Sequence, residues 1–201
     1  MKLELISSLL PLLAAAAPAP ASSSTPQPPA AFTVISSRSA SPIHLLPLNA
    51  AGQSFYLGGS ASTYCPLPSN CPNGTSTVFA GNGGSLSVTV PGGQQIYVSP
   101  EGALKFTQAH SANIPPGSSL RPFEYVPPAA GSVNGFGHYV YNGQGASGFM
   151  ACPVEEEEGQ KWQVFAALQN ATVPGGDVSE CYGFSAIASP TNQTGSVWQY
   201  I

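Results

Sequence analysis

Carboxylate side chains are scarce in this sequence, and the largest group of them stands in one run. Glu155 to Glu158 are adjacent and lie between Pro153 and Gly159. Neighbouring carboxylates repel one another, and calcium loops use spaced oxygen ligands, so we interpret the run as a solvated loop rather than a cation site. Glycosidase chemistry needs two converging carboxylates. The remaining candidates, Glu101, Glu124, Asp177 and Glu180, give no spacing that predicts such a pair.

Serine and histidine are present, but not in a catalytic pattern. A serine hydrolase needs a serine, a histidine and an acid in contact, and His44, His110 and His138 show no characteristic spacing. The segment Gly145-Ala146-Ser147-Gly148 differs from the G-x-S-x-G nucleophile elbow, because its second glycine comes one residue early. Nucleotide-binding glycine patterns and the H-E-x-x-H zinc motif are absent. We therefore expect no catalytic residues and no cofactor, with a secreted hydrolase as the weakest alternative.

The N-terminus predicts export. Met1 and Lys2 lead into a short apolar stretch and then into a run of small residues from Ala14 to Ala17. This order is typical of a secretory signal peptide, which we place at residues 1–21. The competing interpretation is a disordered Ala/Pro-rich terminus on a cytosolic protein. We predict a disordered Pro/Ala/Ser-rich linker over residues 22–31 and a single domain over residues 32–201.

Low charge limits the partners of the chain. Only 7% of its 201 residues are charged and the net charge is −4, whereas globular proteins average about 25% charged residues. Such a chain has little electrostatic attraction for nucleic acid or an anionic membrane. We expect neither nucleic acid nor a membrane span.

Four cysteines suggest a cross-linked domain. An even number in an exported chain favours disulfides, with three connectivities open. We favour Cys65–Cys71, which closes a Pro-rich loop, and Cys152–Cys181, which would stabilise the fold by about 3–4 kcal/mol on the chain-entropy argument. A zinc site is the competing interpretation, but it needs closer cysteine spacing and nearby histidines. We expect no metal.

Three N-x-S/T triplets predict glycosylation. They begin at Asn73, Asn170 and Asn192, and each stands beside Gly or Pro in a predicted loop. Aromatic residues offer a second link to carbohydrate, because an exposed row of rings could stack on sugars, although rings on strands more often pack in a core. The residues considered for such a platform are Tyr56, Tyr64, Tyr97, Tyr125, Tyr139, Tyr141 and Trp162.

The pattern of residues predicts an all-β fold. Three alternating segments between Ser85 and Thr107, joined by turns at Pro91–Gly93 and Ser99–Gly102, predict an antiparallel meander. Asn142-Gly143 predicts a hairpin turn. We expect an antiparallel β-sandwich or closed β-barrel of about ten to twelve short strands, with a trefoil as an alternative. The other predicted strands are Phe32–Ser36, Ile43–Leu46, Gln53–Leu57, Phe123–Val126, Gly137–Tyr141, Phe149–Cys152, Trp162–Ala166 (alternatively a short helix) and Tyr182–Ile187.

Three segments carry a resemblance to a known family. Gly148–Pro153 reads G-F-M-A-C-P, Trp162–Ala166 reads W-Q-V-F-A, and Cys181–Ala188 reads C-Y-G-F-S-A-I-A. In this order they resemble the fungal secreted proteins called cell wall protein PhiA, also labelled IgE-binding proteins. Further similarity lies at Phe32–Val34, Pro91–Val98 and Gly102–Thr107. The acidic run at 155–158 departs from the family pattern.

The resemblance implies function in general terms. It implies a cell-wall location, with cell-wall polysaccharide or other wall proteins as partners. It also implies a link to the development of spore-bearing cells and antigenicity, and it supplies no catalytic residues. We therefore expect a non-enzymatic, glycosylated protein of the fungal cell wall or surface. The alternative is a small secreted carbohydrate-binding or effector-like protein.

Overall fold

The computed structural model describes residues 27–132, 135–154 and 161–201. The predicted signal peptide, half of the predicted linker (residues 22–26) and the acidic run Glu155 to Glu158 lie outside these residues. The described part holds fourteen strands and one short 3₁₀-helix, η1. The elements are β1 (Ala31–Ser37), β2 (Leu48–Ala51), β3 (Ser54–Leu57), β4 (Thr63–Tyr64), β5 (Phe79–Ala80), β6 (Ser85–Leu86), β7 (Gln94–Val98), β8 (Leu104–Phe106), β9 (Phe123–Val126), β10 (Gly137–Tyr141), β11 (Phe149–Val154), β12 (Lys161–Ala166), η1 (Val178–Glu180), β13 (Tyr182–Pro190) and β14 (Gln199–Tyr200).

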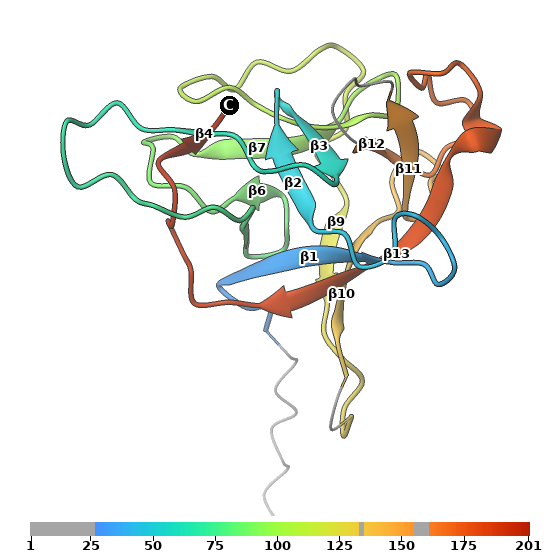
Figure 1. Ribbon diagram of the computed structural model, residues 1–201, viewed down its shortest axis with the longest axis horizontal. Helices are drawn as coiled ribbons and strands as arrows, with labels where there is room; N and C mark the ends of the chain where they lie inside the picture. Colours follow the sequence, from blue (N-terminus) through green and yellow to red (C-terminus); the bar gives the residue numbers. More distant parts are fainter. Residues whose placement is uncertain (1–26, 133–134, 155–160) are drawn as a thin grey trace, which may run out of the picture.

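Twelve strands form one antiparallel sheet that curls around the core (Figure 1). Their order is β1-β5-β6-β7-β8-β3-β12-β11-β13-β10-β9, and β2 pairs with β3 beside this path. Strand β1, which begins this order, also pairs with β13. The remaining strands, β4 and β14, form a separate two-stranded ribbon. The predicted antiparallel all-β class is confirmed.

Two strands, β7 and β13, change their pairing partner along their length. Strand β7 pairs with β6 through Gln94 and Gln95 and with β8 through Ile96–Val98. Strand β13 pairs with β11 through Tyr182–Phe184 and with β1 through Ser185–Pro190. A strand that changes partner along its length joins two layers of a sandwich without leaving an open edge between them.

The core between the layers is a connected set of aromatic rings. Alternation along the strands places them there: in β9, Phe123 and Tyr125 are buried while Glu124 is exposed. Phe32 is fully buried and lies 5.2 to 5.6 Å from three other rings, measured between centroids. Offset and tilted contacts of this kind add to the stabilisation from burial. The connected rings are Phe32, Phe55, Phe79, Phe106, Phe123, Tyr125, Tyr139, Tyr141, Phe149 and Tyr200.

A buried glutamine holds the C-terminal strand against the core. The Gln94 side chain is 1% exposed, and its Nε2 donates to the carbonyls of Thr107 and Tyr200 at 2.9 Å. The Tyr200 amide donates back to Gln94 Oε1 at 2.8 Å. The Tyr200 hydroxyl donates to the Ser76 carbonyl at 2.8 Å and accepts from the Val78 amide at 3.0 Å. Every polar atom of this buried cluster therefore has a partner, as burial requires.

Most of the predicted strands are confirmed, and the meander and its turns are where the sequence places them. The Ser99–Gly102 turn closes with Gly102 N–H donating to the Ser99 carbonyl at 2.9 Å. The segment proposed as strand or short helix in the 160s is strand β12. Strands β9 and β10 have the predicted bounds.

Two local predictions are wrong. Ile43–Leu46 is a turn rather than a strand, because Leu45 takes a left-handed φ of 62° that interrupts an extended chain. Asn142-Gly143 does not form a two-residue hairpin: β10 and β11 pair with different parts of β13 and not with each other. The positive φ angles fall at Gln144 and Gly145 instead.

Among the described residues, no helix has the length and hydropathy needed to cross a membrane.

Replacement of Tyr200 by Phe tests the C-terminal cluster. Tyr200→Phe leaves the buried Val78 amide without an acceptor, so we expect a loss of about 1–3 kcal/mol in the free energy of unfolding near neutral pH. The measurement is urea unfolding followed by fluorescence. Tyr64→Phe is the control, because Tyr64 is 52% exposed, and it should change little.

The same variant should alter the alkaline stability profile. Burial raises the pKa of Tyr200 to about 12, whereas an unfolded tyrosine titrates near 10. The stabilising contribution of Tyr200 is thus complete below pH 10 and is lost as the pH rises from about 10 to 12. We expect a shallower alkaline decline for Tyr200→Phe than for the wild type. Parallel alkaline stability profiles for Tyr200→Phe and the wild type would contradict the described cluster. So would equal losses of stability in Tyr200→Phe and Tyr64→Phe at neutral pH.

Candidate functional site

The structure contains two disulfides, in the pairing that the sequence favours. Cys65 and Cys71 close a surface loop with a Cα–Cα distance of 6.0 Å. Cys152 is buried in β11, and its bond to Cys181 has a Cα–Cα distance of 4.2 Å. Cys181 follows η1, where the Asp177 side chain accepts from the Ser179 amide at 2.8 Å. The longer disulfide therefore ties the loop before β13 to the centre of the sheet.

All three glycosylation triplets lie on accessible loops. Asn73, Asn170 and Asn192 are exposed and lie outside the strands. Two of these loops touch, since the Gly74 amide donates to the Ser196 carbonyl at 2.8 Å. Each asparagine is therefore sterically open to a glycan.

The histidines do not assemble a hydrolase site. His138 Nδ1 lies 3.1 Å from Ser185 Oγ, and this is the one hydrogen-bonding contact between a histidine and a serine side chain in the described residues. Both residues are exposed on neighbouring strands, and no described carboxylate is hydrogen-bonded to His138. Ser147 is exposed elsewhere, and His44 accepts from the Arg38 amide at 3.2 Å. The contact lacks the acid that orients the histidine in a catalytic triad.

The carboxylates are dispersed as well. Glu101 occupies the predicted turn, and Asp177 caps η1, where hydrogen bonding from Ser179 lowers its pKa. Glu124 points outward from β9. No group of three or more His, Cys, Asp or Glu side chains within the described ranges could hold a metal ion.

The aromatic platform considered in the sequence is wrong for most of its members. Tyr139 and Tyr141 are buried in the ring cluster, at 1% and 0% exposure, because they occupy the inward positions of β10. Tyr64 is exposed, and Tyr56 is half-buried under the ammonium group of Lys161. The other members, Tyr97, Tyr125 and Trp162, are also buried.

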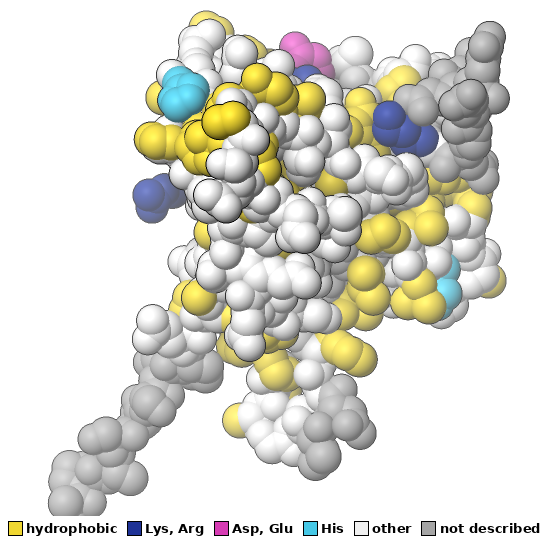
Figure 2. Space-filling view, turned by 60° about the vertical axis from the view of Figure 1, so that its left-hand side comes forward, with side chains coloured by type: hydrophobic (Ala, Val, Ile, Leu, Met, Phe, Trp, Pro, Cys, Tyr) yellow, Lys and Arg dark blue, Asp and Glu magenta, His cyan; other side chains and the backbone are white. Residues whose placement is uncertain are grey.

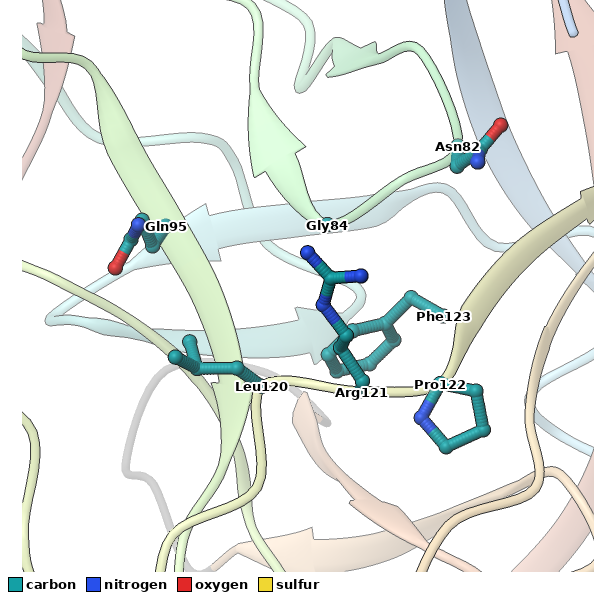
Figure 3. A pocket seen from close by; sticks show the side chains of 7 residues that line it. All are labelled: Asn82, Gly84, Gln95, Leu120, Arg121, Pro122 and Phe123. Carbon is teal, nitrogen blue, oxygen red and sulfur yellow. The ribbon is translucent and has the colours of Figure 1, made fainter.

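A surface hollow of about 370 Å³, here called the Arg121 hollow, opens where three segments meet. One wall is the turn from Asn82 to Gly84, another is Gln95 of β7, and the third is the segment 120–123 leading into β9. Figure 3 shows the Arg121 guanidinium pointing toward Gly84, with Gln95 and Asn82 on opposite sides.

The walls of the Arg121 hollow are fixed by the core beneath them. The Tyr139 hydroxyl donates to the Gly83 carbonyl at 2.8 Å, and a Cβ on Gly83 would lie 2.3 Å from the Tyr139 ring. With its φ of 87°, this position therefore requires glycine. On the other side, Ser119 and Val98 exchange two backbone hydrogen bonds of 2.8 Å.

A second hollow of about 540 Å³, here called the Glu101 hollow, lies over β8 and β12. Its polar lining includes Glu101, Lys105, Gln163 and Thr172. Ser99 also lines it; its hydroxyl is buried and makes no hydrogen bond of normal geometry with a described residue. That hydroxyl still lies close enough to the carboxylate to lower the pKa of Glu101, together with the backbone amide.

Comparison with known proteins identifies the family. The profile of the family described as PhiA-like secreted protein matches residues 32–201. The chain belongs to the PhiA-like secreted protein family. An uncharacterized secreted protein of Arthroderma benhamiae (strain ATCC MYA-4681 / CBS 112371) is 46% identical over 206 residues, which cover 100% of both chains. No solved structure shows significant similarity to the chain. The family resemblance seen in the sequence is thereby confirmed, and it supports an extracellular protein.

Within this PhiA-like fold, sequence reasoning anticipated the exposed asparagines but neither hollow. Both hollows form from segments far apart in the chain, so no spacing in the sequence reveals them. Arg121 is one of a few basic residues scattered along the sequence, and its isolation is the one signal that the sequence gives for the Arg121 hollow.

The two disulfides should differ in their contribution to stability. The pair Cys152 and Cys181 is separated by 29 positions and the pair Cys65 and Cys71 by 6. We expect the double alanine variant of the long pair to lose about 3–4 kcal/mol and that of the short pair about 2 kcal/mol. Urea unfolding of both variants, each with its other disulfide intact, measures the difference. A larger loss for the short pair would show that the long disulfide does not anchor the loop before β13.

Proposed function

We propose that the protein is a non-enzymatic, N-glycosylated protein of the fungal cell wall or surface. The observation that carries this proposal is the placement of all three N-x-S/T asparagines on exposed loops of a disulfide-linked β fold. Oligosaccharide attached at these sites would stay in solvent and leave the core undisturbed. Disulfides of this kind persist in the oxidising environment outside the cell.

The surface fits this role. Figure 2 shows a face made mostly of hydrophobic side chains, uncharged polar side chains and backbone, with few charged groups. A protein with so little charge gains much of its solubility from polar side chains and from attached sugar. Crowded wall polysaccharide is also largely uncharged, so such a surface can lie against it without desolvating many ions.

Family membership supports the extracellular part of this proposal. The link to spore-bearing cells and the binding of IgE rest on the resemblance to PhiA proteins alone. Exposed loops such as those around Asn73 and Asn192 would be the surfaces that antibodies reach.

Carbohydrate binding is the second candidate function, and the Glu101 hollow favours it. A carboxylate, an ammonium, an amide and the buried Ser99 hydroxyl surround it, and these groups suit the hydroxyls of a neutral sugar. If this alternative holds, insoluble glucan or chitin should retain the wild-type protein, and Gln163→Ala should be retained less. Retention of both proteins alike would reject this hollow as the binding site.

Fractionation of fungal cultures tests the main proposal. We expect the protein in the wall and medium fractions, with an electrophoretic mobility that increases after endoglycosidase treatment. Asn73→Gln, Asn170→Gln and Asn192→Gln should each remove one step of that shift. Asn142→Gln is the matched control, because Asn142 is exposed but begins no triplet. Intracellular protein with no glycan-dependent shift would end the proposal.

A further inference from the structure

Arg121 differs from the other basic residues of the described chain. Its guanidinium makes no hydrogen bond, ion pair or ring contact with another described residue. Each of the other three basic side chains is held by a neighbour: Arg38 by the Tyr182 ring and the Gly183 carbonyl, Lys105 by the Ser54 hydroxyl, and Lys161 by the Tyr56 ring. Arg121 is therefore the one basic side chain of the described residues whose charged group has no described partner, and it lies in a hollow.

The surroundings of Arg121 contain hydrogen-bonding groups but no competing acid. Asn82 and Gln95 bring side-chain amides to the hollow, and no described carboxylate lines it. Leu120 is 39% exposed and, with Pro122, adds apolar surface beside the guanidinium. A ligand here would meet one positive charge, two amides that donate and accept, and an apolar contact.

The hollow is also preformed. The backbone bonds of Ser119 to Val98 and the Tyr139 contact with Gly83 hold two of its walls. Phe123 anchors the third wall, since it is 8% exposed and its ring centroid lies 4.9 Å from that of Tyr141. A rigid site loses less entropy on binding than one that must be ordered by its ligand.

We propose that the Arg121 hollow binds an acidic sugar unit of a polysaccharide. The planar guanidinium matches the two oxygens of a carboxylate. The Asn82 and Gln95 amides match sugar hydroxyls, and the carbon face of the ring fits the surface of Leu120 and Pro122. A volume of about 370 Å³ falls within the range of small-molecule sites.

The single positive charge of the Arg121 hollow favours a carboxylate over a phosphate group. Phosphate groups carry close to two negative charges and are usually met by clusters of arginines, whereas the Arg121 hollow offers one. One carboxylate is the charge that one guanidinium balances. An acidic peptide would supply the carboxylate but lacks the ring hydroxyls that the Asn82 and Gln95 amides, on the two sides of the hollow, can satisfy.

Calorimetric titration of the purified, oxidised full chain tests the proposal, with short galacturonate and glucuronate oligosaccharides as probes. We expect saturable binding that Arg121→Gln weakens by roughly tenfold or more. Arg121→Lys should bind with an affinity between those of the wild type and Arg121→Gln, because an ammonium keeps the charge but cannot form two parallel hydrogen bonds to the carboxylate. Arg38→Gln removes the same charge outside the hollow and should bind as the wild type does. The inference does not depend on where the protein resides or on its glycans.

Further probes make the outcome decisive. Neutral glucan oligosaccharides, oligoglutamate and inorganic phosphate should bind weakly or not at all. Nuclear magnetic resonance titration of the wild type should shift the amides of Gly84 and Gln95, and this readout does not rely on any variant folding. No binding of the acidic sugars, equal binding of oligoglutamate or phosphate, equal loss in Arg38→Gln, or shifts confined to other surfaces would each overturn the proposal.

Discussion

The fold depends on a buried exchange of hydrogen bonds between Gln94 and Tyr200. Strand β14 pairs with the two-residue strand β4, and the residues beside it make further backbone hydrogen bonds to Thr89, Val90 and Ser62. Gln94 adds hydrogen bonds inside the core, since its amide satisfies backbone groups of Tyr200 and Thr107 there. The Tyr200 hydroxyl extends the cluster to Ser76 and Val78. The side chains of Gln94 and Tyr200 thus together join the meander, the long loop before β5 and the C-terminus.

Function follows from the rigidity that this cluster and the aromatic core create. Short strands with exposed loops give a scaffold on which the N-x-S/T asparagines and the hollows keep fixed positions. The Arg121 hollow and the buried cluster share strand β7. Gln94 points into the core, whereas the next residue, Gln95, points to the opposite face of the strand, is exposed and lines the hollow. Alternation along one strand therefore places a structural amide in the core and a second amide at the surface hollow.

Regular patterns in the sequence predicted the regular parts of the fold. Alternation of aromatic with polar residues was enough to locate β9 and β10, and Pro and Gly located the turn before β8. Strand β2 has the sequence Leu-Asn-Ala-Ala, which lacks β-branched residues, so tertiary pairing with β3 decides its conformation. The Arg121 hollow joins residues 82, 95 and 121, and no local propensity could predict that contact.

Native-state hydrogen exchange of the amides of Tyr200 and Val78 tests the central claim most directly. Both donate to buried side-chain oxygens, Gln94 Oε1 and the Tyr200 hydroxyl, so the account predicts that they exchange only through global unfolding. Their protection should then match that of amides in the β1–β13 ladder. Exchange of the Tyr200 amide as fast as that of the exposed Gln193 amide would contradict the account, because the C-terminal strand would then open independently of the core.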